Sequence, residues 1–285
     1  MDSNTYTSIR LSTWVDYKVF VDNLSENWAF RGQINSRWRL RTAIERTDFI
    51  KNKKGIEAEF VSEFQRGARN YLNNDELPEH LIEWLALMQH HGAPTRLLDF
   101  SRSPFIAAFF SFEQCFIRDD IDVAIWAINY NFLKNKALAE LAKQFPDDNW
   151  ENKKLINDQL FEKIFYQNEC NLVFPVEPFR MNRRYSLQQS IFLSTGNSSK
   201  SFIEQLEFLG DDMAKAVIRI EMPSGLHKEV LRDLQRMNLN RASLFPDLDG
   251  YAASLRLRYN TMKTPEEAVE QHISKLEDDG FAFIP

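Results

Sequence analysis

The sequence has few of the residues that cross-link or bend a chain. Its 285 residues include two cysteines, nine glycines and ten prolines. Cys115 and Cys170 lie far apart in helical-looking segments, which argues against a disulfide framework and against a thiolate metal site. With 44% hydrophobic residues, this composition is typical of a globular protein and excludes a fibrous or disordered one.

Long apolar segments are also missing. No hydrophobic run approaches the length that crosses a bilayer. The opening residues MDSNTYTSIR have neither the basic start nor the apolar centre of a secretory signal. We therefore expect a cytoplasmic protein with no membrane partner.

The motifs of several common enzyme classes are absent as well. The sequence contains no GxGxxG, P-loop, HExxH, GxSxG or CxxC pattern. The neighbouring His90 and His91 would diverge by about 100° on a helix, so they do not suit a histidine metal site. We expect no bound metal.

Positive charge is concentrated in two segments of a chain whose formal net charge is −6. Residues 27–46, NWAFRGQINSRWRLRTAIER, hold five arginines, and residues 179–184, FRMNRR, hold three. An acidic chain is not coated all over for duplex nucleic acid, so any anion site must be local.

Hydrophobic periodicity predicts a mixture of helices and strands. The expected helices are 12–24, 55–71, 80–92, one that begins at Ser103–Pro104, 225–238 and 250–259. The expected strands are 27–33, 95–100, 122–130, 186–195 and 215–223. Because the two types do not alternate strictly, we expect an α+β fold, with a central sheet of short strands flanked by helices. One domain would cover 1–262, with a helical insertion at 131–172, followed by a helical tail at 263–285.

Arg31 is the sharpest single candidate for a functional residue. It follows two aromatic residues in a buried-looking strand, and Gly32 leaves the backbone open to close approach by a ligand. A guanidinium is always charged, so a buried one must pair or face a ligand. Two interpretations stay open: a salt bridge to Asp99 or Glu45, or a ligand phosphate or carboxylate held by two parallel hydrogen bonds.

Three further arginines follow Arg31 in the sequence. Arg37, Arg39 and Arg41 alternate with apolar residues. This pattern favours a solvated strand face.

The segment HGAPTRLLDFS places polar side chains around a strand that ends where a helix begins. Amides at a helix N-terminus carry partial positive charge, and ligands often bind there. Asp99 and Ser101 would suit binding a ribose or orienting a base, with Thr95 and Arg96 beside them. In the alternative interpretation Arg96 and Asp99 form an internal pair and Ser101 caps the helix.

The segment RRYSLQQSIF supplies a third polar group, with Arg184 at its start. On a strand, Gln188 and Ser190 would share one face and could line a site. The alternative is an edge strand with one wet face. Asp247 and Asp249 stand at alternate positions but lack the rest of a calcium-loop pattern, so Asp249 is expected as a cap or turn residue before the next helix.

Four segments together resemble the FRG domain family, named after its Phe-Arg-Gly signature. They are FRGQ at 30–33, HHGAPTRLLDFSRSPFIAAFFSF at 90–112, RRYSLQQSIF at 183–192 and SLFPDLDGYA at 243–252. The resemblance spans roughly residues 10 to 260, and it identifies the domain expected over 1–262 as an FRG domain. One departure is Ser190, where the family usually has glycine.

A weaker, second-order resemblance is to ADP-ribosyltransferases, whose signature elements occur in a similar order. The matching positions are Arg31–Gly32, Ser101 before its helix, and Gln188-x-Ser190. Under this mapping Arg31 would hold the phosphates or ribose of NAD, Ser101 would position the nicotinamide ribose and Gln188 would orient the acceptor.

The mapping leaves the chemically required anion unassigned. The transferase glutamate stabilises the positive charge that develops on the ribose as nicotinamide leaves. Ser190 stands in that place and cannot supply a charge. Asp99 or Glu221 would have to take the role.

The sequence therefore predicts an arginine-lined cleft that binds a nucleotide-type small molecule, with NAD as substrate for cleavage or for transfer to a protein or nucleic-acid acceptor. The residues expected to act on the substrate are Arg31, Asp99 and Gln188. The residues expected to line the cleft are Gly32, Gln33, His91, Thr95, Arg96, Ser101, Arg184 and Ser190. For a bacterial chain, the resemblance would suit a toxin or a phage-defence system.

Two alternatives remain open. A non-catalytic module would use the arginines to bind a nucleotide or RNA. A metal-dependent phosphodiesterase would use Asp99, Asp247 and Asp249 with His91.

Overall fold

A computed structural model of the chain describes residues 6–47, 55–73, 77–115, 121–148, 156–180 and 182–261. The strands are β1 (Thr7–Arg10), β2 (Trp28–Gln33), β3 (Leu97–Ser101), β4 (Asp122–Asn129), β5 (Val173–Val176), β6 (Ser190–Thr195) and β7 (Val217–Pro223). The helices of the first half are α1 (Trp14–Asp22), η1 (Ile44–Arg46), α2 (Ile56–Ala68), α3 (Leu81–His90), α4 (Pro104–Phe112) and α5 (Tyr130–Gln144).

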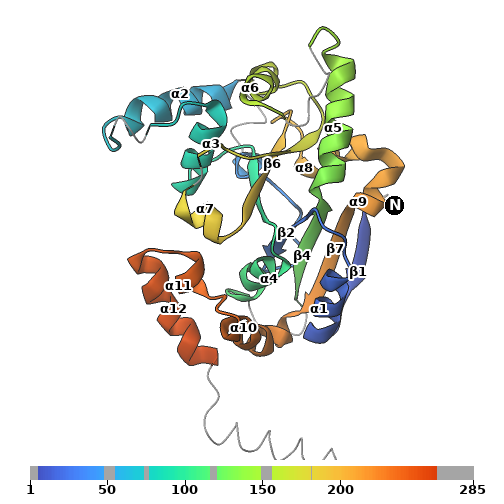
Figure 1. Cartoon of the computed structure of the whole chain (residues 1–285), viewed down its shortest axis with the longest axis vertical. Helices are drawn as coiled ribbons and strands as arrows, with labels where there is room; N and C mark the ends of the chain where they lie inside the picture. Colours follow the sequence, from blue (N-terminus) through green and yellow to red (C-terminus); the bar gives the residue numbers. More distant parts are fainter. Residues whose placement is uncertain are drawn as a thin grey trace, which may run out of the picture.

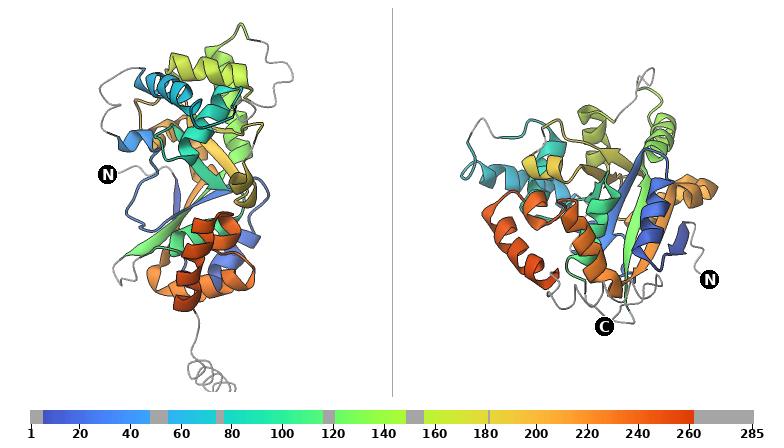
Figure 2. Two further views of the ribbon diagram at one scale, coloured as in Figure 1. Left: turned by 90° about the vertical axis from the view of Figure 1, so that its left-hand side faces the viewer. Right: turned by 60° about the horizontal axis from the view of Figure 1, so that its bottom comes forward.

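The second half of the chain is mainly helical and carries α6 (Asp158–Gln167), α7 (Arg183–Leu187), α8 (Phe202–Leu206), η4 (Glu207–Asp212), α9 (Met213–Ala216), η5 (Ser224–Leu226), α10 (His227–Arg236), α11 (Arg241–Leu244) and α12 (Leu248–Thr261). The last helices, α11 and α12, lie at one end of the molecule, beside α10 and below α7 (Figures 1 and 2). The fold is mixed, with one sheet flanked by helices, as the sequence predicts.

One sheet organises the molecule, with its strands in the order β1-β7-β4-β2-β3-β6-β5. β1 and β7 run parallel, and all other neighbouring strands are antiparallel. The edge strand β5 contains Pro175, which lacks a backbone donor and is tolerated where the neighbouring side of the ladder is open.

The centre of the sheet has a weak seam between β2 and β3. β2 pairs with β4 through six residue pairs and β3 pairs with β6 through five, whereas β2 and β3 share the single pair Phe30 and Ser101. Beyond that pair the two strands diverge, so Arg31 has no partner residue on β3. The seam is where the candidate site lies.

Apolar side chains cover both faces of the sheet. On one face, α1, α4 and α10 pack against β2, β4 and β7, and α2, α3 and α6 pack against β3, β5 and β6. On the other face, α5, α8 and α9 cover a cluster that includes Trp126 and Leu193. Figure 1 shows α4 across the middle of the sheet.

Gly32 is required by the closeness of α4. A Cβ at this position would lie 2.1 Å from the carbonyl oxygen of Ala107 and 2.5 Å from Oγ of Ser111, both on α4. The small residue therefore lets a helix approach the strand, whereas the sequence suggested approach by a ligand.

The segment expected as a helical insertion at 131–172 contributes to the core. Leu133 of α5 packs in the cluster around Trp126, and Phe161 and Ile164 of α6 pack against β5 and α3. The expected tail at 263–285 lies outside the described residues.

Two local predictions were wrong. The strand expected at 186–195 begins only at Ser190, because α7 runs to Leu187 and Gln189 has a positive φ of 48°. Gln188 is the C-cap of α7 and so does not share a strand face with Ser190. The segment that carries Arg37, Arg39 and Arg41 is irregular, not a strand.

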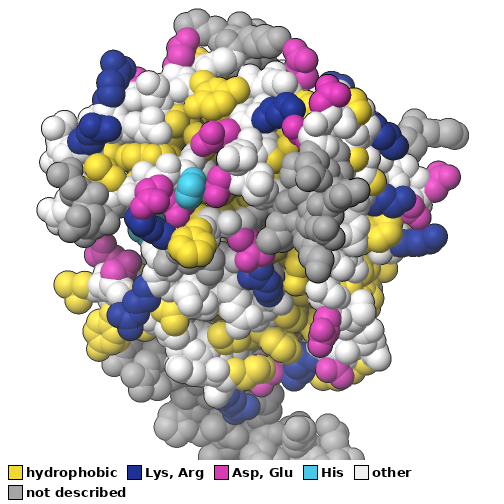
Figure 3. Space-filling view, turned by 45° about the horizontal axis from the view of Figure 1, so that its top comes forward, with side chains coloured by type: hydrophobic (Ala, Val, Ile, Leu, Met, Phe, Trp, Pro, Cys, Tyr) yellow, Lys and Arg dark blue, Asp and Glu magenta, His cyan; other side chains and the backbone are white. Residues whose placement is uncertain are grey.

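The surface carries mixed charge. On the face shown in Figure 3, basic and acidic side chains are interspersed, and no broad patch of one sign gathers there. Within the described residues, no helix is both long and apolar enough to cross a membrane.

Candidate functional site

A cavity of about 370 Å³ opens at the seam, between α3, α4 and α7 and the strands β2, β3 and β6. We call it the arginine cavity. It is lined by Phe30, Arg31, Gly32, Gln89, His90, Gly92, Asp99, Phe100, Ser101, Phe110, Arg184, Tyr185, Gln188 and Ser190. Seven of the residues singled out from the sequence thus meet here: Arg31, Gly32, Asp99, Ser101, Arg184, Gln188 and Ser190.

Arg31 fills the gap where β2 and β3 diverge. Its Nη1 donates to the backbone carbonyl of Asp99 at 2.6 Å, which replaces a ladder hydrogen bond. Its Nε is buried and has no hydrogen-bond partner in the part of the chain that the structure describes. Burial lowers the pKa of this guanidinium, and the nearby Asp99 carboxylate partly opposes the change. Because an arginine stays charged even so, an incompletely bonded cation faces the cavity.

The salt bridges considered for Arg31 do not form. Its contact with Asp99 is to the main chain. Glu45 instead accepts hydrogen bonds from the backbone N–H groups of Thr42 and Phe202, at 2.5 and 2.7 Å. The first interpretation of Arg31, a structural ion pair, therefore does not apply.

Arg184 is a second incompletely bonded cation in the cavity. It lies in α7, whose first turn is capped by Asn182, the acceptor of a 2.9 Å hydrogen bond from the Tyr185 N–H. The Arg184 guanidinium stacks over the ring of Phe245 at 4.4 Å, and its Nε is buried with no partner among the described residues. Stacking fixes the plane of the guanidinium while its donors stay unused.

Asp99 supplies the carboxylate of the cavity. Its Oδ2 accepts a hydrogen bond of 2.5 Å from Nε2 of Gln89 on α3. Oε1 of Gln89 in turn accepts from the hydroxyl of Thr95. This chain of hydrogen bonds fixes the orientation of Asp99, so Thr95 acts through Gln89 and does not line the cavity itself.

Ser101, Gln188 and Ser190 form the floor between β3 and β6. The hydroxyl of Ser101 donates to the carbonyl of Gln188 at 2.7 Å and accepts from the Ser103 N–H, so it closes the turn before α4. Nε2 of Gln188 donates to the carbonyl of Leu244 at 3.1 Å. These bonds tie α4, α7 and α11 together around the cavity.

His90 and Tyr185 complete the wall beside Arg184. Nδ2 of Asn182 donates to Nδ1 of His90 at 3.2 Å, so the proton of the neutral ring is on Nε2. Burial and the neighbouring His91 and Arg184 lower the pKa of His90. Burial raises the pKa of Tyr185, whose hydroxyl donates to the Ala86 carbonyl at 2.6 Å.

Arg96 does not line this cavity, contrary to the sequence prediction. It is 2% exposed and forms a salt bridge of 2.7 Å with Glu57, which is 3% exposed. Its remaining donors reach Thr195 and Asn168, and its guanidinium stacks on Phe165 at 4.2 Å. The partner of Arg96 is Glu57 of α2, 39 residues earlier in the chain, and neither a ligand nor Asp99.

Gln33 and His91 also lie outside the arginine cavity. The side chain of Gln33 bonds Nε1 of Trp126 and the main chain of Arg39, at 2.8 and 3.3 Å, on the side of the sheet that carries the cluster around Trp126. His91 is exposed at the end of α3, with its ring against that of His90.

The phosphodiesterase alternative requires a cluster of metal-binding side chains. Within the described ranges, no group of three or more His, Cys, Asp and Glu side chains is arranged to hold a metal ion. Asp247 accepts a 2.5 Å hydrogen bond from the N–H of Gly250 and so stabilises the first turn of α12.

Sequence reasoning missed Gln89, His90, Phe110 and Tyr185. Gln89 had a usable signal, because it lies four residues after the fully buried Leu85 on an otherwise apolar helix face. A polar residue at such a position must bond another buried group. For the other three, no comparable pattern exists.

The family model of the FRG domain matches residues 26–119. The matched range includes Arg31, Gly32, Gln89 and Asp99 and ends before α7, so Arg184, Gln188 and Ser190 lie outside it. No curated protein and no solved structure matches the chain.

Proposed function

We propose that the arginine cavity binds the phosphates of a nucleotide and that its substrate is NAD, which is cleaved or used to transfer ADP-ribose. The observation that carries the proposal is the pair of guanidinium groups, Arg31 and Arg184, whose buried Nε donors are unused within the described part of the chain. Buried donors without partners are costly. A phosphate satisfies several of them at once, and a guanidinium fork fits its geometry.

The charges of the cavity suit an anionic ligand. Arg31 and Arg184 contribute two positive charges, and Asp99 is the one carboxylate among the described lining residues. His90 stays neutral near pH 7 because its pKa is lowered from a value already below 7. The cavity keeps a net positive charge, because one carboxylate does not neutralise two arginines, and this charge would attract a diphosphate.

Asp99 is the group that supports a reaction in addition to binding. Loss of nicotinamide breaks the bond between its ring nitrogen and C1′ of the ribose, and the electron pair stays with nicotinamide. Positive charge develops on the ribose and is stabilised by a fixed carboxylate. Gln89 and Thr95 hold Asp99 in one orientation, as such a role requires. Water, or an acceptor nucleophile, then forms the new bond to C1′ and releases a proton.

Glu221, the other acid considered from the sequence, is less suitable. It pairs with Arg219 at 2.7 Å on β7 and does not line the arginine cavity. Ser190 lines the cavity but carries no charge.

The proposal is tested by incubating the protein with NAD labelled in its adenylate part, with and without cell lysate. We expect release of nicotinamide or labelling of a macromolecule. Arg31→Ala should weaken both binding and turnover, whereas Asp99→Asn should lower turnover by about 100-fold or more and leave binding of ADP-ribose in place. The matched controls are Arg183→Ala, an exposed arginine beside Arg184, and Asp22→Asn, an exposed acid of α1.

Binding without turnover is the second candidate function. The two unused Nε donors favour anion binding whether or not chemistry follows. ADP-ribose binding that depends on Arg31, with no turnover in any sample, would select this candidate. Failure of both NAD and ADP-ribose to bind at millimolar concentration would contradict both.

A further inference from the structure

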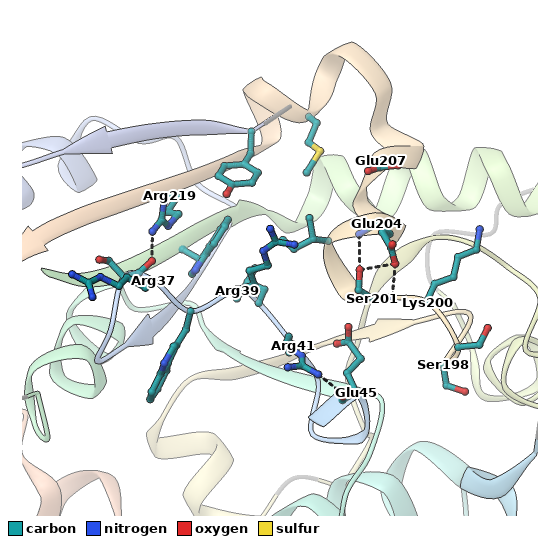
Figure 4. A pocket seen from close by; sticks show the side chains of 18 of the residues that line it. Arg37, Arg39, Arg41, Glu45, Ser198, Lys200, Ser201, Glu204, Glu207 and Arg219 are labelled. Atoms are coloured by element: carbon teal, nitrogen blue, oxygen red, sulfur yellow. Dashed lines mark hydrogen bonds between the residues drawn. The ribbon is translucent and has the colours of Figure 1, made fainter. Parts of the chain in front are cut away.

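A second and larger cavity lies on the opposite face of the sheet. Its volume is about 890 Å³. Residues 36–41 form one wall, residues 198–204 form the other, and Tyr6, Trp126, Met213 and Arg219 lie between them. Figure 4 shows Arg37, Arg39 and Arg41 along one side and Ser198, Lys200 and Ser201 across from them. None of the residues that we placed in the arginine cavity lines this one.

Positive charge dominates the second cavity. Five basic side chains and three carboxylates line it: Arg37, Arg39, Arg41, Lys200 and Arg219 against Glu45, Glu204 and Glu207. Two of the carboxylates are occupied by main-chain donors. Glu45 accepts from the N–H groups of Thr42 and Phe202, and Glu204 accepts from that of Ser201 at 2.8 Å.

Two of the cations are available to a ligand. Within the described residues, the guanidinium of Arg39 and the ammonium of Lys200 have no hydrogen-bond or ion-pair partner. Arg39 is exposed at its wall of the cavity, and Lys200 stands across from it (Figure 4). Cations on both walls would hold a phosphate from two sides.

Hydrogen bonds from neighbouring segments hold the wall formed by residues 36–41 in place. Gln33 donates to the carbonyl of Arg39 at 3.3 Å and accepts from Nε1 of Trp126 at 2.8 Å. Arg41 donates to the carbonyl of Glu45 at 2.6 Å, and Arg219 donates to the carbonyl of Ser36. A wall tied at three points is preorganised, which lowers the entropic cost of binding.

An exposed aromatic side chain adds a different recognition element. Trp38, between Arg37 and Arg39, is 52% exposed and lines the cavity. The other tryptophans in the described ranges are at most 9% exposed. An exposed indole among arginines offers a stacking surface for a base, and base stacking beside cations is how proteins hold single-stranded nucleic acid.

We propose that the second cavity binds a nucleotide unit, with its base on Trp38 and its phosphates between Arg39 and Lys200. The unit would come from a single-stranded nucleic acid or from a free nucleotide. This site does not depend on the function of the arginine cavity.

Titration of the protein with a fluorescein-labelled ten-residue oligouridylate and with ATP tests the proposal and separates the two sources. Binding is followed by polarisation of the label and by quenching of tryptophan fluorescence, to which Trp38 contributes the exposed indole. We expect binding that weakens as salt is raised. Trp38→Ala, Arg39→Ala and Lys200→Ala should each weaken it about tenfold. Arg183→Ala should leave binding of both probes unchanged, and Arg31→Ala, which alters the arginine cavity, should leave binding of the oligonucleotide unchanged.

Each outcome bears on the proposal. Tighter binding of the oligonucleotide assigns the site to single strands, and binding of ATP alone that the three cavity variants weaken assigns it to free nucleotides. Failure of both to bind, or equal binding by wild type and all three cavity variants, would overturn the proposal. Because Arg31→Ala acts on the arginine cavity only, loss of NAD turnover in that variant with oligonucleotide binding intact keeps the two sites distinguishable.

Discussion

Arg31 lies in β2 and Arg96 directly precedes the neighbouring strand β3, but the two arginines have very different surroundings. Arg96 stands one residue before β3, fully enclosed, with its charge matched by Glu57 and its guanidinium over the ring of Phe165. Arg31 lies in β2 and has one main-chain contact and a buried Nε without a partner in the described chain. The difference teaches that a buried arginine indicates a ligand only where its donors are not already used.

The largest effect that we expect is a loss of stability when the buried ion pair between Arg96 and Glu57 is broken. Glu57→Gln keeps the shape of the side chain but leaves Arg96 buried without a counter-charge. Breaking one partner of a buried ion pair typically costs about 3–5 kcal/mol. Urea unfolding should show this loss, whereas Glu63→Gln, an exposed acid on the same helix, should change stability by less than about 0.5 kcal/mol. A loss below about 1 kcal/mol for Glu57→Gln would remove the contrast between the two arginines.

An intermediate effect, on ligand affinity, is expected for Arg184 in the arginine cavity. Arg184→Met keeps the apolar contact with Phe245 and removes the charge. Because no acid in the described part of the chain pairs with Arg184, the variant should be as stable as the wild type. Its affinity for ADP-ribose should fall by about 1.5–3 kcal/mol, the usual contribution of a charged hydrogen bond. Calorimetric titration beside Arg183→Ala measures the difference, and a variant that loses stability but binds ADP-ribose with normal affinity would mean that Arg184 is structural.

The smallest effect concerns pH, because His90 titrates in the arginine cavity. Its pKa is lowered in the folded protein, mainly by burial. As pH falls through the ordinary histidine value near 6.5, the unfolded chain takes up a proton that the folded chain does not, so stability falls. The contribution of neutral His90 is thus fully present above this value.

His90→Gln should make the loss of stability between pH 7.5 and 5.5 smaller than in the wild type, as measured by urea midpoints at the two values. Because the ring is partly exposed, the difference will be modest. ADP-ribose should also reduce the loss, since a bound anion favours protonated His90. An unchanged slope in the variant would show that the ring is not a titrating part of the cavity.

Much of the fold followed from local patterns. The apolar runs around β2, β3, β4 and β7 are long enough to recognise as strands, and Ser103 with Pro104 begins α4 as expected. β1 and β5 were missed because each has only four residues and lies at an edge of the sheet. Short edge strands carry little hydrophobic signal.

The site was predictable where its parts are local and not where they depend on distant segments. Arg31, Asp99 and Ser190 meet because neighbouring strands bring them together. The partner of Arg96 could not be inferred, since nothing in the sequence places α2 over the start of β3. For the same reason the sequence predicted only a solvated strand face around Arg39. The segment across the cavity from it, around Lys200, is 161 positions away in the sequence.

The most direct test of the central claim is the thermal unfolding of the wild type and of Arg31→Ala, each with and without ADP-ribose. A ligand that binds only the folded state stabilises it, by about 2.7 kcal/mol at 100 times its Kd. The account predicts a clear rise in Tm for the wild type and for Arg183→Ala, and none for Arg31→Ala. An equal rise in all three proteins would contradict it, because the ligand would then bind without the arginine left unpaired at the seam of the sheet.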